Sequence, residues 1–263
     1  MLTAIGDHTI RFLSYVGGVS RLTKNGLYWT FIAPFRGSRL RAAASVHQMV
    51  LVGVEAIPVV CLIAYSIGLI MAFQGAYEMA RFGATRYVVD LVAVSMTREL
   101  GPLMTAIIVI GRSGSAFAAE IGTMKVSEEL DALTTMGLNP NYFLVAPKML
   151  SMLIMMPCLT MIADFAGVMG GFTFASLSDL HMGIARYLQT TGDALLARDI
   201  ITGLTKSFMF GGTITVIGCY EGFTVSGGSE GVGKSTTASV VTSIFAVILV
   251  DMLFTAFFYV LGK

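Results

Sequence analysis

Residues 238–261 read ASVVTSIFAVILVDMLFTAFFYVL, a run in which Asp251 is the only charged side chain. About 20 consecutive apolar residues in an α-helix suffice to cross the hydrocarbon core of a bilayer, which is roughly 30 Å thick. Four more apolar runs of this kind occur, at about residues 46–76, 87–111, 149–177 and 200–224. The repetition predicts an all-α integral membrane protein with five transmembrane helices.

The amino-acid composition also indicates that the chain is surrounded by lipid. Hydrophobic residues make up 55% of the 263 residues and charged residues 13%, with a mean hydropathy of +0.78, whereas soluble domains carry roughly 25% charged residues. A net charge of +1 gives no sign of a nucleic-acid partner. The three cysteines and three histidines lack the spacing of a ligand set, so we expect no metal and no cofactor.

The first 45 residues form a segment of their own. Within residues 1–45, Tyr15, Val16 and Val19 recur at helical spacing and basic side chains such as Arg21 lie beside them. A helix of this kind lies in the plane of the membrane interface. We therefore predict an N-terminal amphipathic, interfacial segment that does not span the bilayer, followed by one membrane domain over residues 46–263.

Five spans place the two ends of the chain on opposite sides of the membrane, so basic residues indicate the orientation. With a cytoplasmic N-terminus, ten Lys and Arg residues lie in inner segments: Arg11, Arg21, Lys24, Arg36, Arg39, Arg41, Arg112, Lys125, Lys148 and Lys234. The outer segments then hold five: Arg81, Arg86, Arg186, Arg198 and Lys263. The excess on one side predicts a cytoplasmic N-terminus.

The longest inner connection, residues 112–148, reads as a helix with an apolar stripe. Ile121, Met124, Leu130 and Leu133 alternate with charged residues at helical spacing. A Gly-Leu-Asn-Pro sequence at 137–140 predicts where this helix ends.

One motif suggests a nucleotide site that we do not expect. Gly228–Ser235 matches the phosphate-binding pattern G-x-x-x-x-G-K-[ST], and Asp251 follows an apolar stretch as a magnesium ligand would. The motif works only between a strand and a helix in a covered parallel sheet. Only 15 residues separate Ser235 from Asp251, too few for a helix, a turn and a second strand. We predict a Gly-rich loop before the last span.

Arg98 and Glu99 lie near the middle of the second apolar run. A lone charge there costs at least about 2.5 to 3.5 kcal/mol, so each needs a partner or a wet cavity. Two interpretations stay open: a buried ion pair that fixes helix packing, or a polar pocket in which Glu99 lies near a substrate headgroup. Glu55, Asp164 and Asp251 favour a structural interpretation.

Small residues recur every four positions in two places, at Gly111, Ser115 and Ala119 and at Gly167 and Gly171. Small faces let helices approach closely in lipid. We expect both to be helix contacts.

Several stretches resemble the MlaE/YrbE permease family of bacterial ABC lipid transporters over residues 45–261. They are Arg98–Pro102, Gly111–Ala116, Ala119–Met124, Glu128–Leu133, Met136–Gly137, Asn139–Pro140, Gly227–Gly233 and Thr236–Thr237. The sequence departs from the family pattern at Glu129, where Gln is usual, and at Lys234 and Ser235, where Arg and Ala are usual. The second departure creates the match to the phosphate-binding pattern.

The resemblance implies a homodimer in the bacterial inner membrane, bound to two cytoplasmic ATPase subunits, a periplasmic ring of MCE-domain proteins and optionally a STAS-domain protein. It implies phospholipid as substrate, moved between the inner membrane and the ring for outer-membrane lipid asymmetry or lipid trafficking. ATP hydrolysis then belongs to the partner, and this chain is not itself an enzyme.

The resemblance also implies two sets of site residues. The lipid pathway comprises Arg98, Glu99, Gln74, Tyr77 and Phe82. A coupling helix at about 120–136 docks on the ATPase and comprises Glu120, Met124, Glu128, Leu130, Asp131 and Leu133.

Two other classes compete with this interpretation. A secondary transporter or channel without an ATPase would favour intramembrane carboxylates in inverted repeats, and the two halves show no convincing repeat. A purely structural membrane anchor leaves Arg98 and Glu99 without a role.

Overall fold

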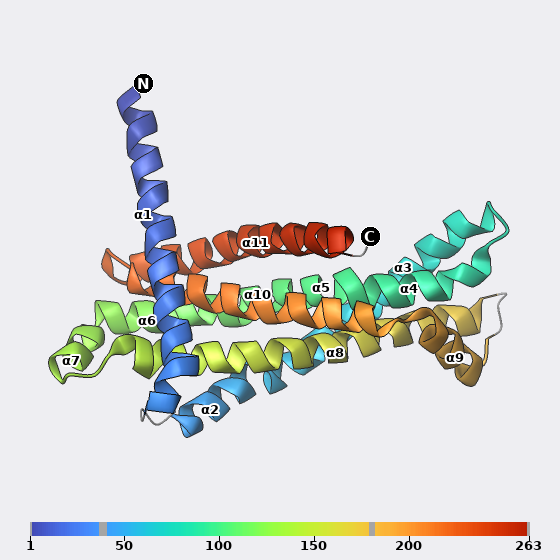
Figure 1. Cartoon of the computed structure of the whole chain (residues 1–263), viewed down its shortest axis with the longest axis horizontal. Helices are drawn as coiled ribbons and strands as arrows, with labels where there is room; N and C mark the ends of the chain where they lie inside the picture. The colour runs from blue at the N-terminus through green and yellow to red at the C-terminus, as the bar shows by residue number, and fades with distance from the viewer. Residues whose placement is uncertain (1, 37–40, 179–181, 262–263) are drawn as a thin grey trace. The chain divides into compact units, whose positions relative to one another are not determined.

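A computed structural model describes residues 2–36, 41–178 and 182–261. The predicted positions of Arg39 and Lys263 lie outside the described residues. Within them the chain is helical and contains no strand (Figure 1). Five helical stretches are long and apolar enough to cross a membrane: Ala42–Ala80, Thr85–Val126, Asn141–Leu177, Ala197–Phe223 and Gly228–Val260. The predicted all-α fold with five spans is confirmed.

The chain divides into two compact units, each assembled from three separate stretches. Unit 1 comprises Met1–Met49, Ile110–Met152 and Gly212–Ala246. Unit 2 comprises Val50–Val109, Leu153–Gly211 and Val247–Lys263. Several helices begin in one unit and end in the other.

Unit 1 contains the N-terminal helix, the long inner connection and the ends of several spans. Its elements are α1 (Leu2–Leu27), the π-helical turn η1 (Tyr28–Ile32), the 3₁₀ turn η2 (Ala33–Arg36), the start of α2 (Ala42–Val52), the π-helical turn η6 (Ile110–Gly114), α6 (Ser115–Val126), α7 (Glu129–Thr135), the π-helical turn η7 (Asn141–Val145) and parts of α8 (Ala146–Leu177), α10 (Ala197–Phe223) and α11 (Gly228–Leu261).

Within unit 1, a tyrosine connects the N-terminal helix α1 to the end of α10. The Tyr15 hydroxyl donates to Glu221 Oε1 at 2.8 Å, and the Tyr15 ring meets the edge of Tyr220 with centroids 4.9 Å apart. Burial, and then the hydrogen bond to Glu221, raise the pKa of Tyr15 above its usual range. Gly18 leaves room for Tyr220, because a Cβ there would lie 2.5 Å from its ring.

The inner connection differs from the single helix predicted at 120–136. The second span continues past residue 111 to Val126, and a separate helix α7 begins at Glu129. The break is at Glu128, whose φ of 61° is left-handed, a conformation that a continuing helix excludes. The Ser127 hydroxyl donates to Thr123 O and so covers a carbonyl at the helix end. Gly137, with φ of 75°, follows α7 where the sequence predicted a stop.

Unit 2 contains the turn between the first two spans, a short helix between the third and fourth spans, and the remaining parts of the spans. Its elements are the 3₁₀ turn η3 (Val54–Ala56), α3 (Ile57–Ala80), the 3₁₀ turn η4 (Thr85–Tyr87), α4 (Val88–Ser95), the π-helical turn η5 (Met96–Leu100), α5 (Gly101–Val109), α9 (Ile184–Ala194) and the remaining parts of α8, α10 and α11.

Glycines let α3 and α8 pack closely in unit 2. A Cβ on Gly68 would lie 1.9 Å from the carbonyl oxygen of Gly167, and one on Gly170 would lie 2.1 Å from that of Tyr65. This confirms the predicted contact role of Gly167. Gly111, in the other predicted small face, meets no described atom within 4 Å, so the chain's own helices do not cover it.

The short helix α9 packs against α4 (Figure 1). Its Tyr187 is fully buried, and the hydroxyl donates to the carbonyl of Val168 at 2.9 Å. Burial raises the pKa of Tyr187 to about 12. This contact fastens α9 to α8.

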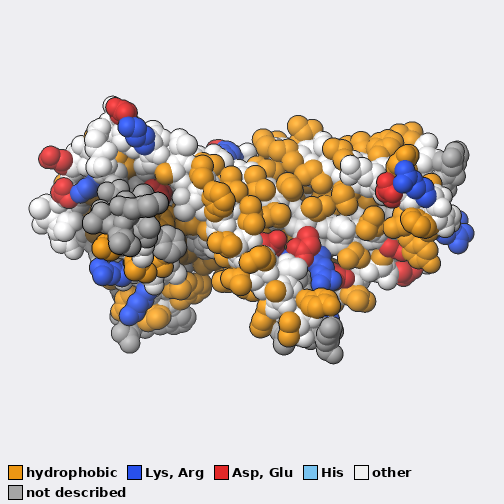
Figure 2. Space-filling model, turned by 90° about the horizontal axis from the view of Figure 1, so that it is seen from above, with side chains coloured by type: hydrophobic (Ala, Val, Ile, Leu, Met, Phe, Trp, Pro, Cys, Tyr) orange, Lys and Arg blue, Asp and Glu red, His pale blue; other side chains and the backbone are white. Residues whose placement is uncertain are grey.

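Large apolar side chains point outward from the spans. Phe245, Leu253 and Phe257 of α11 are all more than half exposed. On the face seen in Figure 2, hydrophobic side chains form much of the surface. Such a surface suits lipid as the surrounding medium.

Candidate functional site

Unit 2 contains a buried cluster of charged and polar side chains from three helices. Lys206 of α10 pairs with Glu99 of η5 and with Asp251 of α11, the latter at 2.9 Å. Its ammonium also donates to Thr255 Oγ1 at 2.7 Å. We call these four residues the Lys206 cluster.

The cluster holds more negative than positive charge. The Lys206 side chain is 0% exposed, whereas Glu99 is 34% and Asp251 18% exposed. Two carboxylates therefore face one ammonium, and the lysine lies on the inside. A buried ammonium in lipid requires such partners, because desolvation costs several kcal/mol per ion. The part of Glu99 that is still accessible can meet a further cation or hydrogen-bond donor.

The π-helical turn η5 positions Glu99. Pro102 has no backbone N–H, so the carbonyl of Arg98 loses its usual α-helical donor. The Gly101 N–H instead donates to Met96 O, five residues back, and widens the turn. A Cβ on Gly101 would lie 1.7 Å from Asp164 Oδ1, so a larger residue there would require the Asp164 side chain to move. Wide turns of this type often occur at functional sites.

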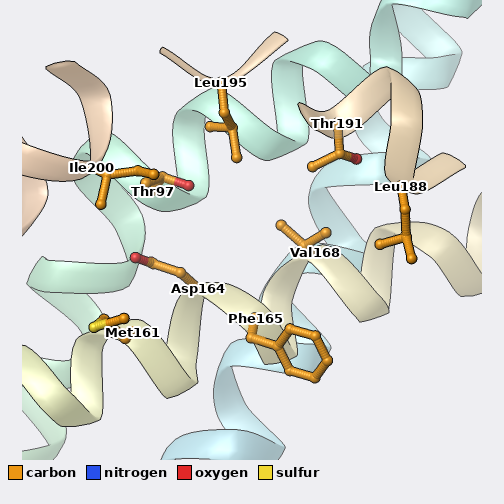
Figure 3. A pocket seen from close by; sticks show the side chains of 9 residues that line it. All are labelled: Thr97, Met161, Asp164, Phe165, Val168, Leu188, Thr191, Leu195 and Ile200. Carbon is orange, nitrogen blue, oxygen red and sulfur yellow. The ribbon is translucent and has the colours of Figure 1, made fainter. Parts of the chain in front are cut away.

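An apolar cavity of about 250 Å³ lies in the same unit (Figure 3). It is lined by Thr97, Met161, Asp164, Phe165, Val168, Leu188, Thr191, Leu195 and Ile200. Oδ1 of Asp164 is buried and has no hydrogen-bond partner among the described residues. Most of the lining is hydrocarbon, which suits part of an acyl chain.

Helix α10 connects this cavity to the Lys206 cluster. Ile200 lines the cavity, Gly203 packs against the carbonyl of Thr97, and Lys206 enters the cluster. Ile200 and Lys206 are six residues apart in α10. Six residues of α-helix rise about 9 Å along the helix axis, which is the separation of the cavity from Lys206. Without a side chain, Gly203 allows η5 to lie directly on α10.

The structure places the predicted lipid-pathway residues in two locations. Glu99 belongs to the Lys206 cluster, and the neighbouring Arg98 is half-buried without a hydrogen bond or salt bridge to a described residue. Gln74, Tyr77 and Phe82 lie exposed at the end of α3 and in the turn after it, Phe82 by 81%.

These two locations are well separated within the chain. Gly75 of α3 packs against Leu91 of α4, so these two residues lie at the same height along their helices. Leu91 comes eight positions before Glu99 in the chain. That difference corresponds to about 12 Å along the helix. The three exposed residues at the end of α3 therefore do not join Glu99 in one pocket of unit 2.

The predicted coupling residues lie in unit 1, in α6, in α7 and in the turn between them. We call this segment, residues 120–136, the hook. Leu130 and Leu133 are 5% and 8% exposed, so their apolar stripe faces the chain's own unit. Glu120 pairs with Lys148 at 2.5 Å and Asp131 with Lys125 at 3.5 Å. Met124 is half-buried and Glu128 exposed. The outward surface of the hook is mostly polar.

The residues of the phosphate-binding pattern are helical. Gly228–Ser235 forms the first turns of α11, and the φ angles of Gly227 and of Gly228 at its start are positive. Lys234 pairs with Glu230 one turn earlier at 2.7 Å, and both are more than three-quarters exposed. The Ser235 hydroxyl donates to Glu221 O at 2.7 Å. This geometry differs from a loop between a strand and a helix, and the predicted loop is instead helix.

Sequence reasoning missed Lys206 and its connection to Asp251 and Thr255. Lys206 lies inside the predicted span 200–224, where a cation needs a carboxylate partner from another span. The available signal was one cation and two carboxylates, each in a different apolar run, because a charge inside the membrane needs a partner of opposite sign.

Five spans and a charged cluster buried among them define a polytopic helical membrane protein with a polar site inside the bilayer. The family model described as Permease MlaE matches residues 45–257. The chain belongs to the MlaE permease family, and it is a multi-pass membrane permease.

Two relatives that match most of their own length are named as permeases, and a third, longer relative is named after a lipid. A probable ABC transporter permease protein of Rickettsia prowazekii is 35% identical and covers 97% of this chain and 96% of its own length. One from Synechocystis is 38% identical over 80% of both chains. The chloroplastic protein TRIGALACTOSYLDIACYLGLYCEROL 1 of Arabidopsis thaliana is 36% identical over 82% of this chain and 61% of its own length. The predicted family is confirmed.

Proposed function

We propose that this permease moves phospholipid across or out of a bacterial inner membrane as the transmembrane subunit of an ABC transporter. The observation that carries the proposal is the Lys206 cluster, a polar site inside the bilayer with an apolar cavity one to two helical turns away. A phospholipid needs both a charged site for its headgroup and an apolar site for its chains. The name of the Arabidopsis relative refers to a diacylglycerol glycolipid, which supports lipid as the broader substrate class.

Arg98 and Glu99 can bind different parts of a phospholipid headgroup. Arg98 offers a planar guanidinium, which binds a phosphate through two parallel hydrogen bonds. Glu99 lies beside it and is partly accessible, so it can meet the ammonium of a zwitterionic headgroup. The other predicted lipid-pathway residues are exposed near the end of α3: Gln74, Tyr77 and Phe82. They can form one lipid pathway with this site only if a second subunit packs over them. We therefore include a homodimer in the proposal.

The partners follow from the same transporter class. Relatives named ABC transporter permeases support a separate cytoplasmic ATPase, which docks on the hook around α7. A periplasmic MCE-domain ring would receive or deliver the lipid, and a STAS-domain protein is an optional further subunit. The N-terminus then lies in the cytoplasm, because α7 and the basic residues share its side of the membrane.

Reconstitution with and without ATP tests this function. The full chain is copurified with its ATPase and reconstituted into proteoliposomes that contain a fluorescent phospholipid. Transfer of this phospholipid to an acceptor protein is then recorded. We expect transfer that depends on ATP and is unaffected by an ion gradient. Transfer driven by an ion gradient without the ATPase would instead assign the chain to secondary transport.

A variant of the hook provides the matched control. Asp131→Arg reverses an exposed charge on α7 and should release the ATPase, whereas Glu230→Gln alters an exposed ion pair on α11 and should not. Copurification of the ATPase with Asp131→Arg at the wild-type ratio would count against docking through α7.

A further inference from the structure

A second cavity, of about 280 Å³, lies in unit 1 and is lined by both polar and apolar side chains. It is bounded by the start of α2, the end of α6 and the start of α8. Its polar lining residues are Arg41, His47, Gln48, Glu120 and Lys148. None of them belongs to the Lys206 cluster. We call this cavity the Arg41 pocket.

The Arg41 pocket lies near the ends of three spans. These are the starts of Ala42–Ala80 and Asn141–Leu177 and the end of Thr85–Val126. Lys148, the lining residue farthest from such an end, is seven positions from Asn141, or about 10 Å along a helix.

The lengths of these spans set the depth of the pocket. The three stretches have 39, 37 and 42 residues, which corresponds to about 55 Å or more of helix. A bilayer with its headgroups is only about 40 to 45 Å thick. We expect the ends to extend into the headgroup layer, which would bring the pocket near the depth of lipid phosphates.

The guanidinium of Arg41 is held in place by Phe143. It stacks 3.5 Å from the ring centroid, and its Nη1 donates to the Phe143 carbonyl at 3.0 Å. A guanidinium has five N–H groups, so most of them stay available to a ligand. A cation fixed in this way loses little entropy when it binds an anion.

The charges of the pocket favour an anion. Arg41 and Lys148 contribute two positive charges and Glu120 one negative charge, which leaves one positive charge before His47 is considered. The Lys148 side chain is 2% exposed and paired with Glu120 at 2.5 Å, so it forms the closed inner wall. His47 and Gln48 add hydrogen-bond donors beside Arg41.

We propose that the Arg41 pocket binds the phosphate of a phospholipid headgroup from the adjoining leaflet. Its volume suits a headgroup, while the acyl chains stay in the bilayer. Headgroups are the anions that the membrane itself supplies at this depth, and basic pockets between transmembrane helices bind them. The site does not depend on the proposed transport function.

Lipid retention tests the Arg41 pocket directly. The full chain is purified in detergent, titrated with phosphatidylglycerol and measured by native mass spectrometry. Arg41→Gln should lower retention of one lipid roughly tenfold or more, because it removes charge-assisted hydrogen bonds. Lys125→Gln removes an equal charge from an exposed ion pair of the same unit and should retain the lipid.

A second pair of variants leaves Arg41 and its contact with Phe143 intact. Ala44 lines the pocket and Ala43 is exposed beside it without lining it. Ala44→Glu places a carboxylate in the pocket and should weaken retention at least as much as Arg41→Gln, whereas Ala43→Glu should not. Equal retention by Ala44→Glu and Ala43→Glu would overturn the proposal.

Inorganic phosphate distinguishes the two sources of this chemistry. The same titration is repeated in millimolar phosphate and in millimolar chloride. A lipid site should keep its lipid in both, because the acyl chains add apolar contacts with the protein that the free ion lacks. Loss of the lipid in phosphate alone would show a site for the soluble ion and overturn the lipid assignment.

Discussion

Among the described residues two lysines are buried, one in each unit, and their surroundings differ. Lys148 is paired with one carboxylate, Glu120, whose side chain is 47% exposed. Lys206 is paired with two carboxylates and a hydroxyl, all from other helices. The first arrangement is balanced and partly solvated. The second carries an excess negative charge inside the bilayer, which a purely structural ion pair does not need.

The largest effect is expected for Lys206→Met. It leaves Glu99 and Asp251 facing each other without a cation, and breaking a buried pair by removing one partner costs about 3 to 5 kcal/mol. We expect a strong loss of thermal stability in detergent, measured by intrinsic fluorescence. A melting temperature equal to that of the wild type would show that water reaches the cluster and solvates the two remaining carboxylates.

Lys148→Met should cost less. The Glu120 carboxylate that it leaves behind is nearly half exposed and can take up water, so we expect a loss of about 1 to 3 kcal/mol. The same fluorescence melt applies, with Lys206→Met measured alongside. If Lys148→Met proved the more damaging change, the contrast between the two lysines would be reversed.

Thr255→Val tests the hydroxyl of the Lys206 cluster. The threonine accepts from Lys206 at 2.7 Å and lies 3.3 Å from Glu99 Oε1, so valine of the same shape removes a bridge between them. A loss of about 1 kcal/mol is expected. Thr237→Val, at an exposed hydroxyl of the same helix, is the control and should have little effect.

The smallest effect is expected for Lys234→Gln. Its ion pair with Glu230 is exposed on both sides, and such pairs contribute about 0 to 1 kcal/mol. Because the same lysine completes the phosphate-binding pattern, this variant also tests that motif. Loss of ATP-dependent transfer in Lys234→Gln with unchanged stability would revive the nucleotide interpretation.

The fold was predictable because membrane insertion depends on local sequence. A run such as 238–261 needs no distant contact to identify it as a span. The ends of the spans were less predictable, since polar residues such as Lys125 continue a helix beyond the hydrocarbon core. The break at Glu128 gave no signal, because glutamate rarely adopts a left-handed conformation.

The candidate site was only half predictable. Glu99 was identified because a charge inside an apolar run is costly wherever its partner lies. Lys206, Asp251 and Thr255 come from two other spans, and one sequence does not reveal which faces of three helices meet. The residues at the end of α3 came from the family resemblance, and whether they join Glu99 stays a prediction about the dimer.

Phospholipid transfer by Glu99→Gln tests the central claim most directly, namely that the excess carboxylate of the Lys206 cluster serves the substrate. The variant keeps Asp251 as a partner for Lys206, so the fold should persist. We predict at least a tenfold loss of ATP-dependent transfer in proteoliposomes, with ATPase copurification intact and Glu230→Gln at the wild-type rate. Wild-type transfer by Glu99→Gln would contradict the account and leave the cluster a structural ion pair.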